Sequence, residues 1–296
     1  MAQPVINRSN TPRGKKKTTK RFRFRFSIII LIFALSFGLN FWTFWKGAYS
    51  EGVSANPVSD VIKESSTTDS QTDSTAETTV TSDSAVNPEN ITNPVPESAR
   101  INSSYFDTCA FIGDSTMMGI GSYGFVDTKN VYTARGLRPD QLPNTKITTE
   151  SYGDILVIDA LKQALPKNVY ILLGSNGVAW LDNNKIISDY KAFIAEVKAA
   201  LPESDIYIIS VFPVGTDVEA KPSPSEGQVL NTQVDAFNAM LLTMANEEKI
   251  YYIDVNSTLK DAGGKLAADI TNDGTHITKT AYEDVTNYIL SHTVAK

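Results

Sequence analysis

The sequence contains few of the residues that cross-link proteins or bind metals. One cysteine and two histidines occur in 296 residues, so no disulfide can form within the chain. Cys109 lies in an apolar, strand-like run, which favours a small buried side chain over a catalytic thiol. No group of His, Cys and carboxylate residues has the spacing of a metal site. We therefore expect neither a metal nor another cofactor.

Basic residues are concentrated at the N-terminus and are sparse elsewhere. Nine lysines and arginines lie before residue 26, yet the formal net charge of the chain is -6. The remainder of the chain is therefore acidic, and it lacks the concentrated positive surface that phosphate binding requires. We expect no nucleic acid partner.

One long stretch lacks charge altogether. Residues 26–45 are apolar and uncharged, and roughly 20 such residues suffice for a helix to cross a bilayer. Because a cluster of nine basic residues precedes this run, residues 1–25 are expected to be a cytoplasmic tail and residues 26–46 a signal anchor. The rest of the chain would then be extracellular, on a single-pass membrane protein. A signal peptide cleaved near Ala55 is the alternative.

After the apolar run the composition becomes polar, and residues 65–84 are almost free of large apolar side chains. This segment is rich in Ser, Thr, Asp, Glu and Asn, and it cannot bury enough surface to offset the entropy of ordering. We interpret residues 47–103 as a disordered linker and residues 104–296 as one globular domain of ordinary size. The linker would hold the domain near the membrane and the inner cell wall.

Within the domain, short apolar runs alternate with amphipathic stretches, a pattern typical of βαβ units and a mostly parallel sheet. Ligands bind outside the carboxyl ends of the strands in such sheets, so the loops there are where chemistry is expected. Strands are expected at Cys109–Ile112, Val131–Thr133, Val169–Leu173, Ile206–Val211 and Tyr251–Val255. Helices are expected at Asp154–Leu165, Lys185–Leu201, Gln228–Glu248 and Thr278–His292.

A serine in the setting of a nucleophile follows the first expected strand. Gly113, Asp114 and Ser115 come directly after this strand, and residues 116–120 can open a helix. A serine at that corner lies at the sheet edge, near a helix N-terminus that favours developing negative charge. The same residues are typical of a strand-to-helix turn with a Ser or Asp cap, so the motif alone leaves both interpretations open.

A serine needs a base before it can attack an ester at neutral pH, and histidine is the usual one. His276 lies in a polar loop after the last expected strand, whereas His292 lies near the end of the final helix. Asp273 precedes His276 by three residues, a spacing that lets its carboxylate hold the second imidazole nitrogen. The alternative is that Asp273 and Thr275 only cap the final helix.

Two other loops carry candidate oxyanion donors. Asn176, in Gly174-Ser175-Asn176-Gly177, follows an expected strand and can aim its side-chain amide at an oxyanion. Gly136 follows the second expected strand and can offer its backbone N–H to the same oxygen. Each motif alone is also typical of an ordinary turn.

Taken together and in this order, the four motifs resemble the four blocks that define the SGNH (GDSL) hydrolase superfamily of serine esterases. The resemblance covers the region from about Tyr105 to His292, and each block follows an expected strand. It implies an α/β fold, a three-layer α/β/α sandwich with a five-stranded parallel sheet of flavodoxin-like type. The alternation of strands and helices agrees with that fold.

The resemblance also implies a role for each motif. Ser115 would be the nucleophile, His276 its base and Asp273 the acid that orients the base. The backbone N–H groups of Ser115 and Gly136 and the side chain of Asn176 would form the oxyanion hole.

One position departs from the family pattern, and several neighbours suggest a pocket. The third block usually reads Gly-x-Asn-Asp, whereas this chain has Gly177 in place of the final acid. Arg135 and Arg138 flank the proposed oxyanion glycine and can meet an anionic group, or they are solvated surface charges. An apolar or sugar-stacking wall is expected from Met117, Met118, Tyr123, Trp180, Phe212 and Pro213, unless these side chains belong to the core.

The residues and the resemblance together predict an extracellular serine esterase that hydrolyses small acyl esters, acetyl in particular, on cell-wall carbohydrate. Acylated carbohydrate or another small ester is thus the expected partner. An alternative is an O-acetyltransferase that modifies a wall polymer with a separate membrane acyltransferase partner. A third interpretation is an inactive wall-binding domain, and Gly177 is its only support.

Overall fold

The computed structural model describes residues 91–294 of the chain. The predicted cytoplasmic tail, the predicted anchor at residues 26–46 and most of the predicted linker lie outside the described residues. Within the part that is described, no helix combines the length and the apolar character needed to span a bilayer.

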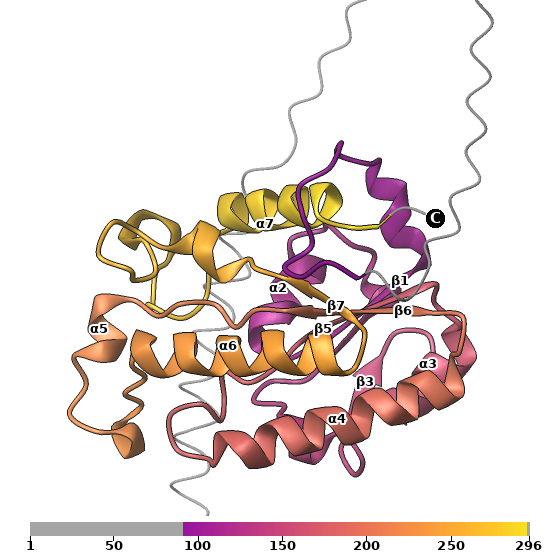
Figure 1. Ribbon diagram of the computed structural model, residues 1–296, viewed down its shortest axis with the longest axis horizontal. Helices are drawn as coiled ribbons and strands as arrows, with labels where there is room; N and C mark the ends of the chain where they lie inside the picture. Colours follow the sequence, from indigo (N-terminus) through magenta and orange to yellow (C-terminus); the bar gives the residue numbers. More distant parts are fainter. Residues whose placement is uncertain (1–90, 295–296) are drawn as a thin grey trace, which may run out of the picture. The chain divides into compact units, whose positions relative to one another are not determined.

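A parallel sheet of five strands forms the centre of the domain, in the order β2-β1-β5-β6-β7 (Figure 1). All four neighbouring pairs run parallel, so every strand ends at the same edge. The predicted parallel sheet is confirmed, and its strands differ from the expected ranges by a residue or two. The strands are β1 (Cys109–Gly113), β2 (Val131–Thr133), β5 (Asn168–Leu172), β6 (Asp205–Ile209) and β7 (Tyr251–Ile253).

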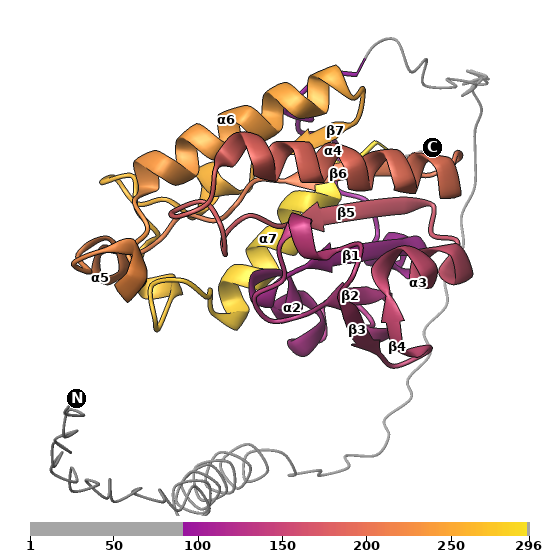
Figure 2. The ribbon, with the colours of Figure 1, turned by 90° about the horizontal axis from the view of Figure 1, so that it is seen from below.

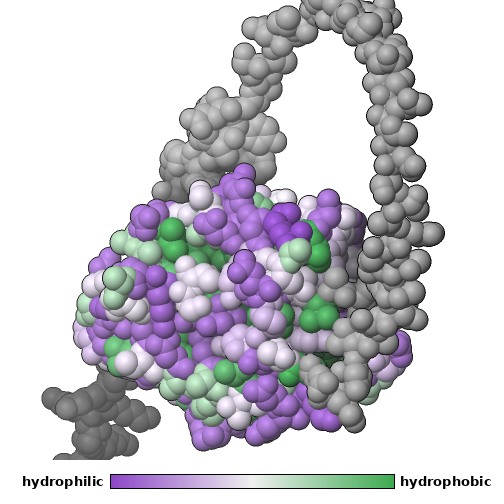
Figure 3. Space-filling view, turned by 45° about the horizontal axis from the view of Figure 1, so that its top comes forward, coloured by the Kyte–Doolittle hydropathy of each residue, from purple (hydrophilic) through white to green (hydrophobic). Residues whose placement is uncertain are grey.

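Helices cover both faces of the sheet and complete three layers (Figures 1 and 2). One face carries α2 (Ser115–Ser122) and α7 (Lys279–Ser291), and the surface on the α7 side is mainly hydrophilic (Figure 3). The other face carries α3 (Val157–Ala164), α4 (Asn183–Ala200) and α6 (Asn231–Glu247). Shorter helices are η1 (Ser103–Thr108), η2 (Thr128–Asn130), η3 (Pro139–Gln141), α5 (Thr216–Glu219), η4 (Pro224–Glu226), η5 (Asn256–Leu259) and η6 (Ala268–Ile270).

A row of aromatic rings holds four strands together on the α7 side. Phe111, Tyr170, Tyr207 and Tyr251 are register partners on successive strands, and their rings stack with centroids 5.0, 4.6 and 4.6 Å apart. Such cross-strand pairs stabilise a sheet beyond the area that they bury. Two of the hydroxyl groups share a partner, since those of Tyr170 and Tyr207 lie 2.9 and 3.3 Å from Thr293 Oγ1.

A two-stranded hairpin replaces the start of one expected helix. β3 (Lys146–Thr149) and β4 (Gly153–Leu156) pair antiparallel, and Ile147 faces Ile155 across them. The helix predicted from Asp154 therefore begins only at Val157. The apolar spacing of this segment suits a strand and a helix equally, and pairing with β3 decides in favour of the strand.

The domain begins earlier than the sequence predicts. Residues 91–102, which we expected to be linker, pack against the domain instead. The Asn93 side chain accepts a hydrogen bond from the Tyr252 N–H at 2.7 Å and donates one to the Ile250 carbonyl at 2.8 Å. Val95 is 4% exposed. The boundary predicted at residue 104 is thus wrong, because a few polar anchors and three apolar side chains, Ile91, Val95 and Ile101, suffice to order a segment of low hydrophobicity.

Candidate active site

Ser115 lies where strand β1, the second strand in the order of the sheet, turns into helix α2. Asp114 is the N-cap of this helix and accepts the Thr116 N–H at 2.8 Å, so Ser115 is the first helical residue. The backbone N–H of a first helical residue has no partner within its helix, and it points out of the positive end of the helix dipole. The Ser115 side chain is partly exposed. The serine is thus presented at the carboxyl edge of the sheet, as expected.

The loop before α7 brings a histidine and an aspartate to this serine. The distance from His276 Nε2 to Ser115 Oγ is 2.9 Å, and that from His276 Nδ1 to Asp273 Oδ2 is 2.7 Å. The other carboxylate oxygen, Asp273 Oδ1, accepts the backbone N–H groups of Thr275 at 2.9 Å and His276 at 2.7 Å. Helix α7 is capped by Thr278, so the alternative in which Asp273 only caps this helix is wrong.

The hydrogen bonds to Asp273 keep its carboxylate ionised. Partial burial raises its pKa, but the backbone N–H of His276, the imidazole and the N–H of Thr275 together outweigh burial and lower the pKa to about 2. An ionised Asp273 accepts the proton on His276 Nδ1, which leaves Nε2 free to accept the Ser115 hydroxyl proton. The arrangement can therefore remove a proton from Ser115 and stabilise the resulting imidazolium.

A turn after β5 presents the side chain of Asn176 to the same edge. Gly174 has φ +130, and a Cβ there would lie 2.4 Å from the Phe237 ring, so only glycine fits. Asn176 Nδ2 donates to Asp114 Oδ2 at 2.7 Å. An amide nitrogen carries two hydrogens, so one remains for an oxyanion while the other fixes the orientation of the side chain.

Asp114 organises the site in a way that sequence reasoning missed. It is fully buried, and its carboxylate accepts hydrogen bonds from the Thr116 N–H and hydroxyl, from the Ser175 hydroxyl and from Asn176. The capping role was visible in the sequence as one interpretation of the Gly113-Asp114-Ser115 turn. The bonds to residues 61 and 62 positions away had no local signal.

Gly136 lies in the loop after β2, the strand next to β1 in the sheet. Its φ is +71, in the left-handed region that favours glycine. Among residues 91–294, no acceptor pairs with the Gly136 N–H. A donor role in the oxyanion hole stays a prediction for this residue.

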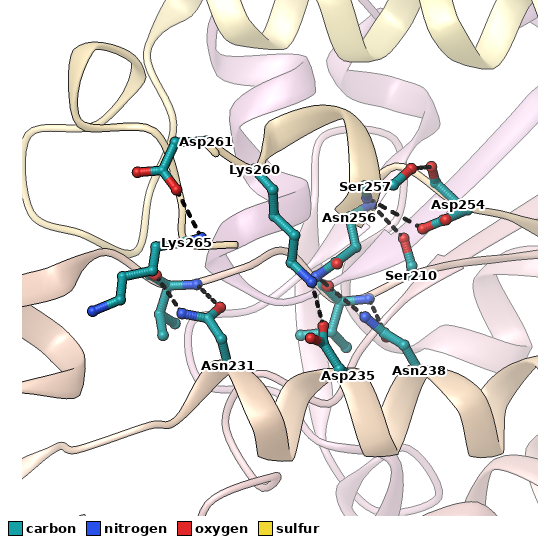
Figure 4. Close-up of polar contacts among 12 residues, drawn as sticks. Ser210, Asn231, Asp235, Asn238, Asp254, Asn256, Ser257, Lys260, Asp261 and Lys265 are labelled. Carbon is teal, nitrogen blue, oxygen red and sulfur yellow. Dashed lines mark hydrogen bonds and ion pairs between the residues drawn. The ribbon is translucent and has the colours of Figure 1, made fainter. Parts of the chain in front are cut away.

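Three buried asparagines fix the loop after β6, beside the catalytic edge (Figure 4). Asn238 pairs with both the N–H and the carbonyl of Val211, at 2.8 and 2.9 Å, and Asn231 does the same at Val214, at 2.9 and 2.8 Å. Asn256 also donates to the Val211 carbonyl, at 2.8 Å. These bonds satisfy the backbone of a loop that is itself buried.

The loop after β6, which these asparagines fix, in turn supports the loop that carries Asp273 and His276. The Gly215 N–H donates to the Gly274 carbonyl at 2.8 Å, which joins the loop after β6 to the loop that carries Asp273 and His276. Within the latter loop, the Thr271 hydroxyl donates to the His276 carbonyl at 2.7 Å. The base is thus positioned by short-range bonds and by one link to a rigid neighbour.

Most of the side chains expected to form a pocket wall belong elsewhere. Met117 and Phe212 are 2% and 5% exposed and pack in the core beneath α2 and α7, so the prediction that they line a pocket is wrong. Pro213 is buried and Met118 is partly buried. Tyr123 follows the last turn of α2, at the opposite end from Ser115, and packs on Tyr282 with ring centroids 5.4 Å apart.

Trp180 is the most exposed of the six, at 58%, and Tyr123 follows at 42%. The two arginines differ in exposure: Arg135 is exposed, whereas Arg138 is half-buried and forms an ion pair with Asp140.

Gly177 lies in the turn that holds Asn176. A Cβ at this position would lie 3.0 Å from both Leu181 and Ile186, so the surroundings of the missing family acid are apolar here.

Comparison with known proteins identifies one matching family. The GDSL-like Lipase/Acylhydrolase family matches residues 111–283, more than half of the 296-residue chain. An acylhydrolase structure from Bacteroides fragilis is 18% identical with a TM-score of 0.50, over 66% of this chain and 88% of that one. A GDSL-like lipase from Bacteroides thetaiotaomicron is 16% identical with a TM-score of 0.48, over 64% and 87% of the two chains. No curated protein matches the sequence.

The chain belongs to the GDSL-like lipase/acylhydrolase family, as its four motifs predict, and is a carboxylic ester hydrolase. The Bacteroides fragilis structure shares its fold.

Proposed function

We propose that this chain is a serine esterase that removes small acyl groups, acetyl in particular, from cell-wall carbohydrate. One observation carries the proposal: Ser115, His276 and Asp273 form a continuous chain of hydrogen bonds, 2.9 and 2.7 Å long, at the carboxyl edge of the sheet. A nucleophile, its base and an orienting carboxylate in this order are the machinery of acyl transfer.

The reaction proceeds in two halves. His276 Nε2 takes the Ser115 proton while Oγ attacks the ester carbonyl, and the oxyanion receives hydrogen bonds from the Ser115 N–H, the Gly136 N–H and the Asn176 amide. The imidazolium then gives its proton to the departing sugar oxygen, which leaves the acyl group on Ser115. Water, deprotonated by His276, attacks this acyl-enzyme. The imidazolium returns that proton to Ser115 Oγ as the carboxylic acid departs, which restores the free enzyme.

The surroundings of the site support a small acyl group on a large alcohol. The His276 and Asp273 side chains are 45% and 55% exposed, so an ester attached to a polymer can reach them without entering a deep cavity. The Met117 and Phe212 side chains are buried in the core, so they offer little apolar surface to a long acyl chain. A long-chain lipid would need such a surface.

The test compares the full-length protein with its Ser115→Ala variant on p-nitrophenyl acetate and on chemically O-acetylated N-acetylglucosamine oligosaccharides. We expect the unaltered protein to release acetate from both substrates and the variant to release none above background. Cleavage of longer acyl esters only would overturn the choice of acetyl. Transfer of acetyl to an added oligosaccharide faster than to water would identify a transferase instead.

We also propose that the domain works outside the cell, anchored through residues 26–46. Support comes from the uncharged run and from the basic residues that precede it. Protease treatment of intact cells should remove the esterase domain from the membrane fraction. Protection of the domain until the cells are lysed would contradict this location.

A further inference from the structure

Trp180 is an exposed aromatic side chain at the catalytic edge of the sheet. It lies in the turn that follows β5, four residues after Asn176, and its side chain is 58% exposed. Large apolar side chains that remain exposed at a site are typical of binding surfaces. Among the described residues, the other exposed aromatic side chain is Tyr123, at the far end of α2.

The Trp180 ring is held in place by a clamped arginine. The Arg138 guanidinium lies over the ring, 5.4 Å from its centroid. Arg138 Nε and Nη2 each donate to the Asp140 carboxylate at 2.9 Å, so the guanidinium cannot turn freely. A cation over one face of an indole is attracted by its π electrons. The ring is therefore preorganised even though most of it faces solvent.

The order of the strands places the loops that carry this pair on either side of the strand that carries the nucleophile. Arg138 follows β2 and Trp180 follows β5, and these two strands flank β1, which carries Ser115. Their loops are the same two that carry Gly136 and Asn176. The contact between Arg138 and Trp180 thus joins the two loops proposed to bind the oxyanion.

We infer that Trp180 is a stacking platform for the pyranose ring that bears the ester, with Arg138 as the residue that positions the platform. The apolar C–H face of a sugar stacks on an indole, and a ring held in advance loses little entropy on binding. This inference rests on the proposed function and adds to it a residue that selects carbohydrate esters over other esters.

The experiment measures kcat/KM of the full-length protein and its variants on two substrates with the same acyl group. The substrates are p-nitrophenyl acetate, which has no sugar, and an O-acetylated N-acetylglucosamine oligosaccharide. For Trp180→Ala we expect the ratio of glycan to aryl acetate activity to fall about 10-fold or more, mainly through KM. Trp180→Phe should recover part of the ratio, and Arg138→Gln should lower it less than Trp180→Ala does.

Tyr123→Ala is the matched control, because it removes an exposed aromatic side chain far from Ser115; it should leave both activities unchanged. Equal losses on the two substrates in Trp180→Ala, or no loss on the glycan, would overturn the platform and leave the proposed function standing. Failure of the unaltered protein to release acetate from any glycan, with aryl acetate still cleaved, would overturn both. Trp180→Phe keeps the test decisive if the alanine variant misfolds.

Discussion

The two halves of the active site are built in different ways. The nucleophile half rests on a buried network, in which fully buried Asp114 ties Ser175 and Asn176 to the start of α2. The base half is exposed: the His276 and Asp273 side chains are 45% and 55% accessible. Apart from the contact of His276 with Ser115, the hydrogen bonds of these two side chains stay within one loop. One backbone bond from Gly215 links that loop to a rigid neighbour.

Because of this difference, substitutions in the two halves should affect the stability of the fold and the catalytic rate in different proportions. A change in the nucleophile half disturbs bonds that also hold the core together, so folding and rate should suffer together. A change in the base half removes bonds that water can largely replace, so the rate should suffer almost alone. The following predictions test this contrast, from the largest expected effect to the smallest.

The two histidines of the chain provide the sharpest contrast. His276→Ala should lower kcat by roughly 10⁴- to 10⁶-fold, because it removes the base, while the midpoint of thermal unfolding changes little. His292 is its matched control, since it is 8% exposed and stacks on Tyr288 with ring centroids 3.7 Å apart. His292→Ala should lower the unfolding midpoint and keep the activity. A reversed pattern would show that we have assigned the base to the wrong histidine.

Asn176→Ala tests the proposed oxyanion donor. Loss of one such donor costs roughly 10²- to 10³-fold in kcat, and KM should change little, because the bond strengthens only as negative charge develops. Steady-state kinetics on an aryl acetate give both constants. An unchanged kcat would mean that Asn176 serves only to satisfy Asp114.

Asp114→Asn should affect both properties at once. The amide cannot accept all four hydrogen bonds that the carboxylate accepts, so at least one buried donor loses its partner. We expect a loss of roughly 1–3 kcal/mol in the free energy of unfolding and a fall in kcat, as Asn176 loses its orientation. Denaturant unfolding and kinetics on the same sample measure the two effects. Loss of activity at full stability would contradict the contrast between the halves.

The smallest effect concerns pH. The pKa of Asp273 is about 2 in the folded protein, below the ordinary value of about 4 in an unfolded chain. Its stabilising contribution is thus present above pH 4 and is lost as the pH falls towards 2. Because the side chain is half-exposed, we expect less than about 1 kcal/mol. Unfolding free energies measured across this interval should fall more for the unaltered protein than for Asp273→Asn; equal slopes would contradict the lowered pKa.

Much of this architecture could be predicted from the sequence, because its signals are local. Buried parallel strands appear as short apolar runs, and Ser115, Asn176 and His276 each follow such a run or the loop after it. The ends of parallel strands meet at one edge, so widely separated motifs could be assigned to one site before the structure was known.

What escaped prediction depends on contacts between distant residues. Met117 follows Ser115 by two positions, yet the helical turn directs it into the core. The roles of Asp114 and of the buried asparagines arise from partners that lie far away in sequence, such as Asn238 and Val211. Asn93 orders a segment of linker-like composition for the same reason.

The most direct test of the account is covalent labelling of the full-length protein with a p-nitrophenyl phosphonate ester, followed by mass spectrometry of its peptides. We predict one adduct, on the Ser115 hydroxyl, which forms slowly in His276→Ala and not at all in Ser115→Ala. Labelling of another residue, or equal labelling of the Ser115→Ala protein, would contradict the assignment of Ser115 as the nucleophile.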